Sequence, residues 1–170
     1  MKTTAAQWVW KALSSLFFFG YFPIAPGTAG SAVAVAAVWL LSIHAPGLFA
    51  FSLVKYHWAA LFAVSGIAIF LCSRGKQAFD ADDPGQIIVD EFAGQLITFF
   101  MVPITWRTCI LGFLLFRFFD IIKPYPVYKI EEIEGGVGIA MDDIIAGIYA
   151  NFSLSGILWS YQFILKLLHS

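Results

Sequence analysis

The sequence predicts an all-α, multi-pass membrane protein, a bundle of about five spanning helices preceded by an N-terminal interfacial helix. Of its 170 residues, 60% are hydrophobic and only 12% are charged, whereas charged residues make up about 25% of a soluble domain. The apolar residues form continuous runs rather than the alternating pattern of a membrane barrel. No linker composition interrupts these runs, so we expect residues 1–170 to form a single membrane-embedded domain.

The first apolar segment, residues 5–20, is not typical of a cleaved signal peptide. Lys11 interrupts it, and bulky aromatic residues follow where a cleavage site needs small ones. We expect a helix that lies in the membrane interface, with Lys11 at the level of the lipid headgroups.

Five longer apolar runs follow, and Pro or Gly residues mark the turns between them. The predicted spans are Thr28–Ile43, His57–Cys72, Ile87–Val102, Thr108–Ile122 and Ile139–Leu167. A spanning helix needs about 20 residues, so the first four must extend into their flanks, thin the bilayer or stop partway.

Five acidic residues lie within or at the ends of these runs, where an unpaired carboxylate costs several kcal/mol. They are Asp90, Glu91, Asp120, Asp142 and Asp143. With five alternating spans, all of them fall on one side of the membrane. That side carries five Lys or Arg residues (positions 74, 76, 117, 123 and 129) against three on the other, which predicts that it faces the cytoplasm.

The acidic residues at positions 90–91 and 142–143 form two adjacent pairs, each at the start of a predicted helix. Such pairs can stabilise the N-terminal end of a helix dipole. They also suit Mg²⁺, which takes carboxylate oxygens together with water and substrate phosphate. Asp90 and Asp143 each precede a glycine by four residues, Gly94 and Gly147. Because glycine lets a neighbouring helix approach closely, this spacing predicts two helices packed around one ion.

Basic side chains accompany the acids in the fourth predicted span. Arg117 and Lys123 flank Asp120 at intervals of three residues, and Arg117 could instead form only an internal salt bridge with Asp120. Pro124 disfavours helical geometry at Lys123, so we expect the helix to end there and its ammonium to point at an anion.

Two further segments are candidates for the same site. Thr28, Gly30 and Ser31 open the first span, where free helix amides and hydroxyls can bind an anion; alternatively, Thr28 is an N-cap. Asp83 precedes a Pro-Gly turn and is a secondary candidate.

Four motifs in this order resemble the bacterial phosphatidylglycerophosphatase A family over about residues 20–150: Pro26–Ser31, Asp83–Gly94, Phe116–Pro126 and Gly135–Gly147. The resemblance implies a Mg²⁺-dependent inner-membrane enzyme that removes the terminal phosphate of phosphatidylglycerophosphate to give phosphatidylglycerol. The family's acidic motifs map onto Asp90, Glu91, Asp120, Asp142 and Asp143. Its basic and glycine-hydroxyl motifs map onto Arg117, Lys123, Thr28 and Ser31.

Several alternatives remain open at this stage. Attack by a metal-activated water is expected, with an aspartyl-phosphate intermediate as the rival route. A transporter would place its carboxylates near the bilayer midplane. The motifs of histidine lipid phosphatases and of CDP-alcohol transferases are absent. A net charge of −1 gives no reason to expect a nucleic-acid partner.

Overall fold

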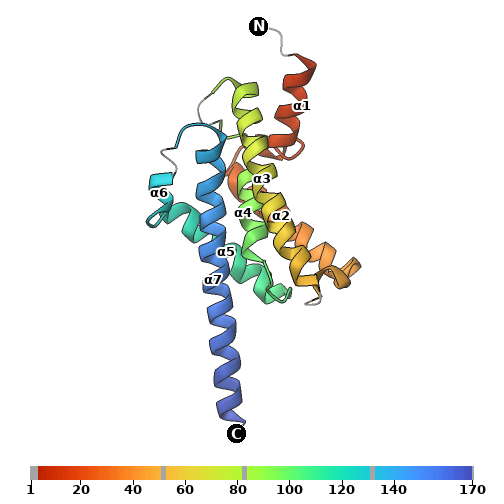
Figure 1. The fold of residues 1–170 in the computed structure, drawn as a ribbon, viewed down its shortest axis with the longest axis vertical. Coiled ribbons are helices and arrows are strands. Elements are labelled where there is room, and N and C mark those ends of the chain that lie inside the picture. Colours follow the sequence, from red (N-terminus) through yellow and green to blue (C-terminus); the bar gives the residue numbers. More distant parts are fainter. Residues whose placement is uncertain (1–3, 51–52, 82–83, 131–132, 170) are drawn as a thin grey trace.

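The structure is a computed structural model that describes residues 4–50, 53–81, 84–130 and 133–169. Within these ranges every regular element is a helix (Figure 1). The elements are α1 (Ala5–Ser14), η1 (Phe19–Tyr21), α2 (Pro26–His44), η2 (Pro46–Phe49), α3 (Val54–Phe79), α4 (Val89–Thr98), α5 (Trp106–Ile122), α6 (Val127–Ile130) and α7 (Gly136–Leu168).

Three of the described helices, α2, α3 and α7, are long and apolar enough to cross a membrane. The predicted count of five spans is not confirmed, because two of the apolar runs form shorter helices. α4 has ten residues, about 15 Å at 1.5 Å per residue, which is half of a hydrocarbon core of about 30 Å. Its apolar run continues to Val102, but the chain leaves helical geometry after Thr98 and turns at Met101, where φ is 55°.

α1 begins at a capping box in which Thr4 and Gln7 satisfy each other's backbone amides. The helix lies along the upper part of α3 (Figure 1). Trp10 packs edge-on against Phe70, and the guanidinium of Arg74 lies over both rings. α1 is therefore fixed to a candidate span, and its location at the membrane interface stays a prediction.

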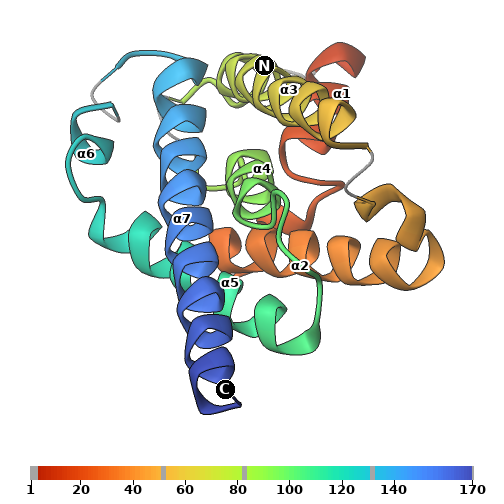
Figure 2. The same cartoon turned by 60° about the horizontal axis from the view of Figure 1, so that its bottom comes forward.

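α4 is the central helix, with α2, α3, α5 and α7 arranged around it (Figure 2). Seven of its ten residues are buried, including the polar residues Asp90, Gln95 and Thr98. Beyond its C-terminal end lies an apolar groove of about 480 Å³, formed with α2, η2 and α3. Among the described helices, the one with the largest buried share is thus too short to cross the bilayer.

α4 and α7 cross at backbone contact, as the spacing of Gly94 and Gly147 predicts. A Cβ on Gly147 would overlap the carbonyl of Gly94. A Cβ on Gly94 would lie 2.5 Å from the carbonyl oxygen of Asp143 and 2.6 Å from the ring of Phe116. Only glycine fits at this crossing, and the close contact brings Asp90 and Glu91 of the first turn of α4 beside Asp143. Asp142 and Asp143 were predicted to begin a helix, but α7 begins at Gly136, so that they lie about two turns inside it.

Replacement of Gly147 by alanine should therefore destabilise the protein, even though alanine favours a helix by about 1 kcal/mol. Overpacking at the crossing costs about 1–3 kcal/mol and outweighs that gain. Gly156 is the matched control on the same helix, because no atom lies within 4 Å of a Cβ placed there. In thermal unfolding in detergent, Gly147→Ala should lower Tm and Gly156→Ala should raise it; shifts in the same direction would contradict the packing described.

Candidate functional site

A cleft of about 580 Å³ lies where α4 and α7 begin, close to the ends of α3 and α5. Six of the acidic and basic residues predicted for a site line it. They are Asp90, Glu91, Asp120, Lys123, Asp142 and Asp143. Segments far apart in the sequence thus bring their charged side chains to one end of the helical bundle.

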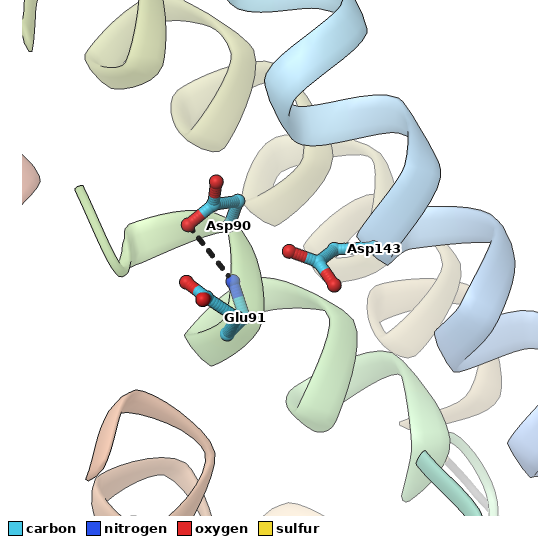
Figure 3. A group of neighbouring side chains, drawn as sticks. All are labelled: Asp90, Glu91 and Asp143. Atoms are coloured by element: carbon cyan, nitrogen blue, oxygen red, sulfur yellow. Dashed lines mark hydrogen bonds between the residues drawn. The ribbon is translucent and has the colours of Figure 1, made fainter. Parts of the chain in front are cut away.

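Asp90, Glu91 and Asp143 form the innermost group, the carboxylate cluster. Each offers an oxygen, and these oxygens lie within 4.8 Å of one another. Asp143 points from α7 toward the two acids of α4 (Figure 3). The exposed fractions of Asp90 and Asp143 are only 5% and 4%. Three carboxylates this close and this dry could hold a metal ion.

The electrostatics of the α4 acids favour such an ion. Burial raises the pKa of Asp90 well above its usual range, and the neighbouring Glu91 charge raises it further. Burial also raises the pKa of Glu91, while its hydrogen bond with Asp90 and the charge of Arg117 oppose that rise. A bound cation would lower the cost of keeping these carboxylates ionised.

Unsatisfied oxygens point to the same conclusion. Among the described residues, Glu91 Oε2 and Asp143 Oδ1 are buried without a hydrogen-bond partner. A buried polar atom left without a partner costs about 1–3 kcal/mol, and more if it is charged. The donor set consists of carboxylate oxygens alone, which is the chemistry of hard ions such as Mg²⁺, Ca²⁺ or Mn²⁺.

Lys123 is held beside the carboxylate cluster by Asp142. Its Nζ lies 3.0 Å from Asp142 Oδ2, while Asp142 Oδ1 accepts the amide of Asp143 at 2.9 Å. α5 ends at Ile122, and Lys123 is its C-cap in the left-handed conformation, with φ 46°. The predicted helix end at Lys123 is confirmed. The turn directs the ammonium into the cleft.

Arg117 and Asp120 form the salt bridge that was considered as an alternative, with Arg117 Nη1 2.5 Å from Asp120 Oδ2. Asp120 lines the cleft, whereas Arg117 is not among the residues that line it. A Cβ on Gly27 would overlap the Glu91 carboxylate and would lie 3.4 Å from the Arg117 guanidinium. The Arg117 charge therefore lies next to both Glu91 and Asp120.

The first turn of α2 contributes differently from the prediction. α2 begins at Pro26 with Ala25 as its N-cap, so the alternative that Thr28 is an N-cap is wrong. Thr28, Gly30 and Ser31 do not line the cleft. Ser31 Oγ donates to the carbonyl of Gly27 at 3.0 Å, and a Cβ on Gly30 would lie 2.9 Å from the carbonyl of Ile88. Their binding of phosphate stays a prediction, and Asp83 lies outside the described residues.

Sequence reasoning missed three residues at the cleft. Lys76 and Glu134 line it, and Gly27 makes room for the Glu91 carboxylate. A signal for Lys76 was present, because it lies one turn beyond Cys72 on the face of α3 that packs inward. Gly27 belongs to a motif already singled out, but nothing in the sequence shows which glycine of that motif meets an acid.

The helices and the cleft together define a helical protein that has three helices long and apolar enough to cross a membrane and a buried carboxylate site. The family model for Phosphatidylglycerophosphatase A matches residues 12–158, and the chain belongs to this family.

Three relatives are similar over most of the chain. Phosphatidylglycerophosphatase A of Escherichia coli is 34% identical, covering 88% of this chain and 81% of its own. The Haemophilus influenzae protein of the same name is 38% identical, covering 79% of each chain. A Bacteroides thetaiotaomicron protein, named provisionally as a phosphatidylinositol-3-phosphatase, is 35% identical, covering 84% of this chain and 89% of its own. No solved structure matches the chain.

A methyl group at Gly27 should weaken cation binding without removing any carboxylate. Gly27→Ala would displace the side chain of Glu91 from the carboxylate cluster. We expect at least about a tenfold loss of Mn²⁺ affinity, equivalent to about 1.4 kcal/mol, measured by electron paramagnetic resonance of free Mn²⁺. Gly66→Ala is the control, since no atom lies within 4 Å of a Cβ there. Equal affinity in both variants would exclude Glu91 from the ion site.

Proposed function

We propose that this protein is a Mg²⁺-dependent phosphatidylglycerophosphate phosphatase of the bacterial inner membrane. It hydrolyses the terminal phosphomonoester to give phosphatidylglycerol and phosphate in phospholipid biosynthesis. The observation that carries the proposal is the buried carboxylate cluster beside Lys123, in a chain of this family. Membership of this family supports a lipid substrate, whose acyl chains would stay in the bilayer.

The topology we propose keeps the cleft at the cytoplasmic face. α2, α3 and α7 span, and α4 with α5 forms a hairpin that enters the bilayer from the cytoplasmic side and returns to it. The support is that the start of α4 and the end of α5 both reach the cleft, through Asp90 and Lys123. The hairpin replaces two predicted spans without reversing the orientation of α7. α1 would lie in the interface on the same side.

The residues present fit Mg²⁺, and Asp90, Glu91 and Asp143 would hold it, with Asp120 and Asp142 beside them. Such an ion neutralises charge on phosphate oxygens and lowers the pKa of a water molecule. The attacking water oxygen forms a bond to phosphorus while the bond from phosphorus to the glycerol oxygen breaks. One proton of the attacking water passes to the Asp120 carboxylate. It is returned through water in the cleft to the departing glycerol oxygen, which leaves as a hydroxyl group, and Asp120 is again a carboxylate.

Two cations of the site have different roles: Lys123 acts on the phosphate, and Arg117 acts on Asp120. Lys123 is placed to offset charge that grows on the transferred phosphoryl group, and Asp142 keeps its ammonium in the cleft at 3.0 Å. Arg117 holds Asp120 by their ion pair. An aspartate nucleophile is the rival route, and trapping of radioactive phosphate on an aspartate during turnover would establish it.

Release of phosphate from phosphatidylglycerophosphate by the purified protein tests the proposal directly. We expect Mg²⁺-dependent release that EDTA abolishes and that Asp143→Asn lowers by about 10²–10³-fold. Asp80→Asn is the matched control, because Asp80 is exposed at the end of α3 and does not line the cleft. Phosphatidylinositol 3-phosphate is assayed in parallel, because a relative carries that name.

Each outcome separates one part of the proposal. Phosphate release that survives EDTA would show that the reaction needs no metal ion. Release that survives Asp143→Asn would show that the carboxylate cluster is not the catalytic site. Preference for the inositol lipid would change the substrate but keep the chemistry. No release from folded protein would favour a transporter.

Lys76 is expected to recognise the second phosphate group of the substrate. It lines the cleft from α3, and Lys123 lines the same cleft from the end of α5. Hydrogen bonds to charged groups contribute about 1.5–3 kcal/mol, so Lys76→Met should raise KM for phosphatidylglycerophosphate at least about tenfold. Phosphatidic acid has no phosphodiester, and its hydrolysis should change much less. Lys55→Met, at the far end of α3, is the control; equal effects on both lipids would exclude this role for Lys76.

A further inference from the structure

The C-terminal end of α4 lies inside the bundle, where water cannot satisfy its last carbonyl groups. Thr98 is fully buried. Its carbonyl does not receive the amide of Val102, which donates to Phe99 at 3.2 Å instead. The helix therefore needs a donor from another part of the chain.

Asn151 of α7 supplies that donor. Its Nδ2 donates to the carbonyl of Thr98 at 3.0 Å and to that of Phe100 at 2.8 Å. Because both partners are acceptors, only the NH₂ end of the amide fits between them. One side chain thus closes the end of a helix that lies about fifty residues earlier in the sequence.

The two helices carry matched positions along their contact. Asp90, Gly94 and Thr98 follow one another at intervals of four on α4, and Asp143, Gly147 and Asn151 do so on α7. Both helices begin at the cleft, so they run in the same direction. Acids meet at the first level, glycine backbones at the second, and the Asn151 amide meets the α4 carbonyls at the third.

These three levels have different mechanical roles. A glycine crossing sets how closely two helices approach, but its smooth surface resists sliding and rotation only weakly. The two hydrogen bonds of Asn151 are directional, so they fix both the position of α4 along α7 and its rotation. Eight residues, about 12 Å of helix, separate Asn151 from Asp143, and the same interval separates Thr98 from Asp90. A shift at the third level is therefore transmitted to the acids by two short, rigid segments.

We propose that Asn151 is a positioning residue: by capping α4 from α7 it sets the register that holds Asp143 against Asp90 and Glu91. The inference rests on the proposed function, since the spacing it controls is that of the ion-binding carboxylates. Asn151 itself touches neither substrate nor ion. Its effect reaches the reaction only through the geometry of the carboxylate cluster.

The test uses full-length protein in detergent and measures Mg²⁺ binding without turnover. Asn151→Leu keeps the approximate size of the side chain and removes both donors, and Asn151→His retains one N–H donor. Ser155→Leu is the control, a polar-to-leucine change at an exposed position one turn further along α7. The Mg²⁺ concentration for half-maximal thermal stabilisation of the EDTA-treated protein is the first measurement.

We expect Asn151→Leu to raise that half-maximal Mg²⁺ concentration at least about tenfold, equivalent to about 1.4 kcal/mol, and to lower kcat with little change in KM. The half-maximal Mg²⁺ concentration of Asn151→His should lie between those of Asn151→Leu and wild type. If Asn151→Leu does not fold, Asn151→His is measured in its place. A variant with reduced Tm but unchanged Mg²⁺ dependence would overturn the proposal, because Asn151 would then be a structural cap only.

Hydrogen exchange separates this proposal from the proposed function. In Asn151→Leu, faster exchange should extend from Leu96–Val102 to the α4 amides near Asp90. Faster exchange confined to Leu96–Val102 would contradict positioning. If wild type bound no Mg²⁺ and released no phosphate, the proposed function would fail, and the extent of the exchange would still decide whether Asn151 sets the register of α4.

Discussion

The close contact of α4 with α7 is the constraint on which the rest of the structure depends. With no side chain at Gly94 or Gly147, the two backbones touch, and three carboxylates come within 4.8 Å of one another. Such an arrangement is unfavourable by itself, because like charges repel in a dry site. The surrounding charges limit the cost: Arg117 lies next to Glu91 and pairs with Asp120, and Lys123 pairs with Asp142.

The rest of the bundle maintains this contact. α4 is surrounded by four helices (Figure 2), and its two ends are fixed by different means. At its start, the amide of Ile88 donates to the carbonyl of Ser14 at 3.1 Å, and at its end Asn151 donates to the carbonyls of Thr98 and Phe100. A helix too short to span the membrane can remain ordered there because each of its ends is hydrogen-bonded to another segment of the chain.

Much of this arrangement can be predicted from the sequence, because the free-energy cost of a carboxylate in an apolar run and the spacing of residues along a helix are local properties. A carboxylate in an apolar run needs a partner wherever it lies, and Pro124 ends α5 at Lys123 as expected. The length of α4 was not predictable, since an apolar run has the same composition whether it is helical or turns at Met101. The partners of Gly27 and Asn151 could not be predicted either. Contacts between helices depend on the rotation and register of each helix, which the periodicity of apolar residues in the sequence does not determine.

The apolar groove below α4 makes the two ends of the molecule chemically unlike. One end presents acids and lysines, and the other an almost wholly apolar hollow of about 480 Å³. Under the proposed function and topology such a protein is sided: its charged cleft meets the headgroups of one leaflet, while the groove at the other end is lined mainly by hydrocarbon side chains. A phosphorylated lipid made in the opposite leaflet would have to flip across the membrane before this protein could act on it, so the place of lipid synthesis and the orientation of the chain must agree.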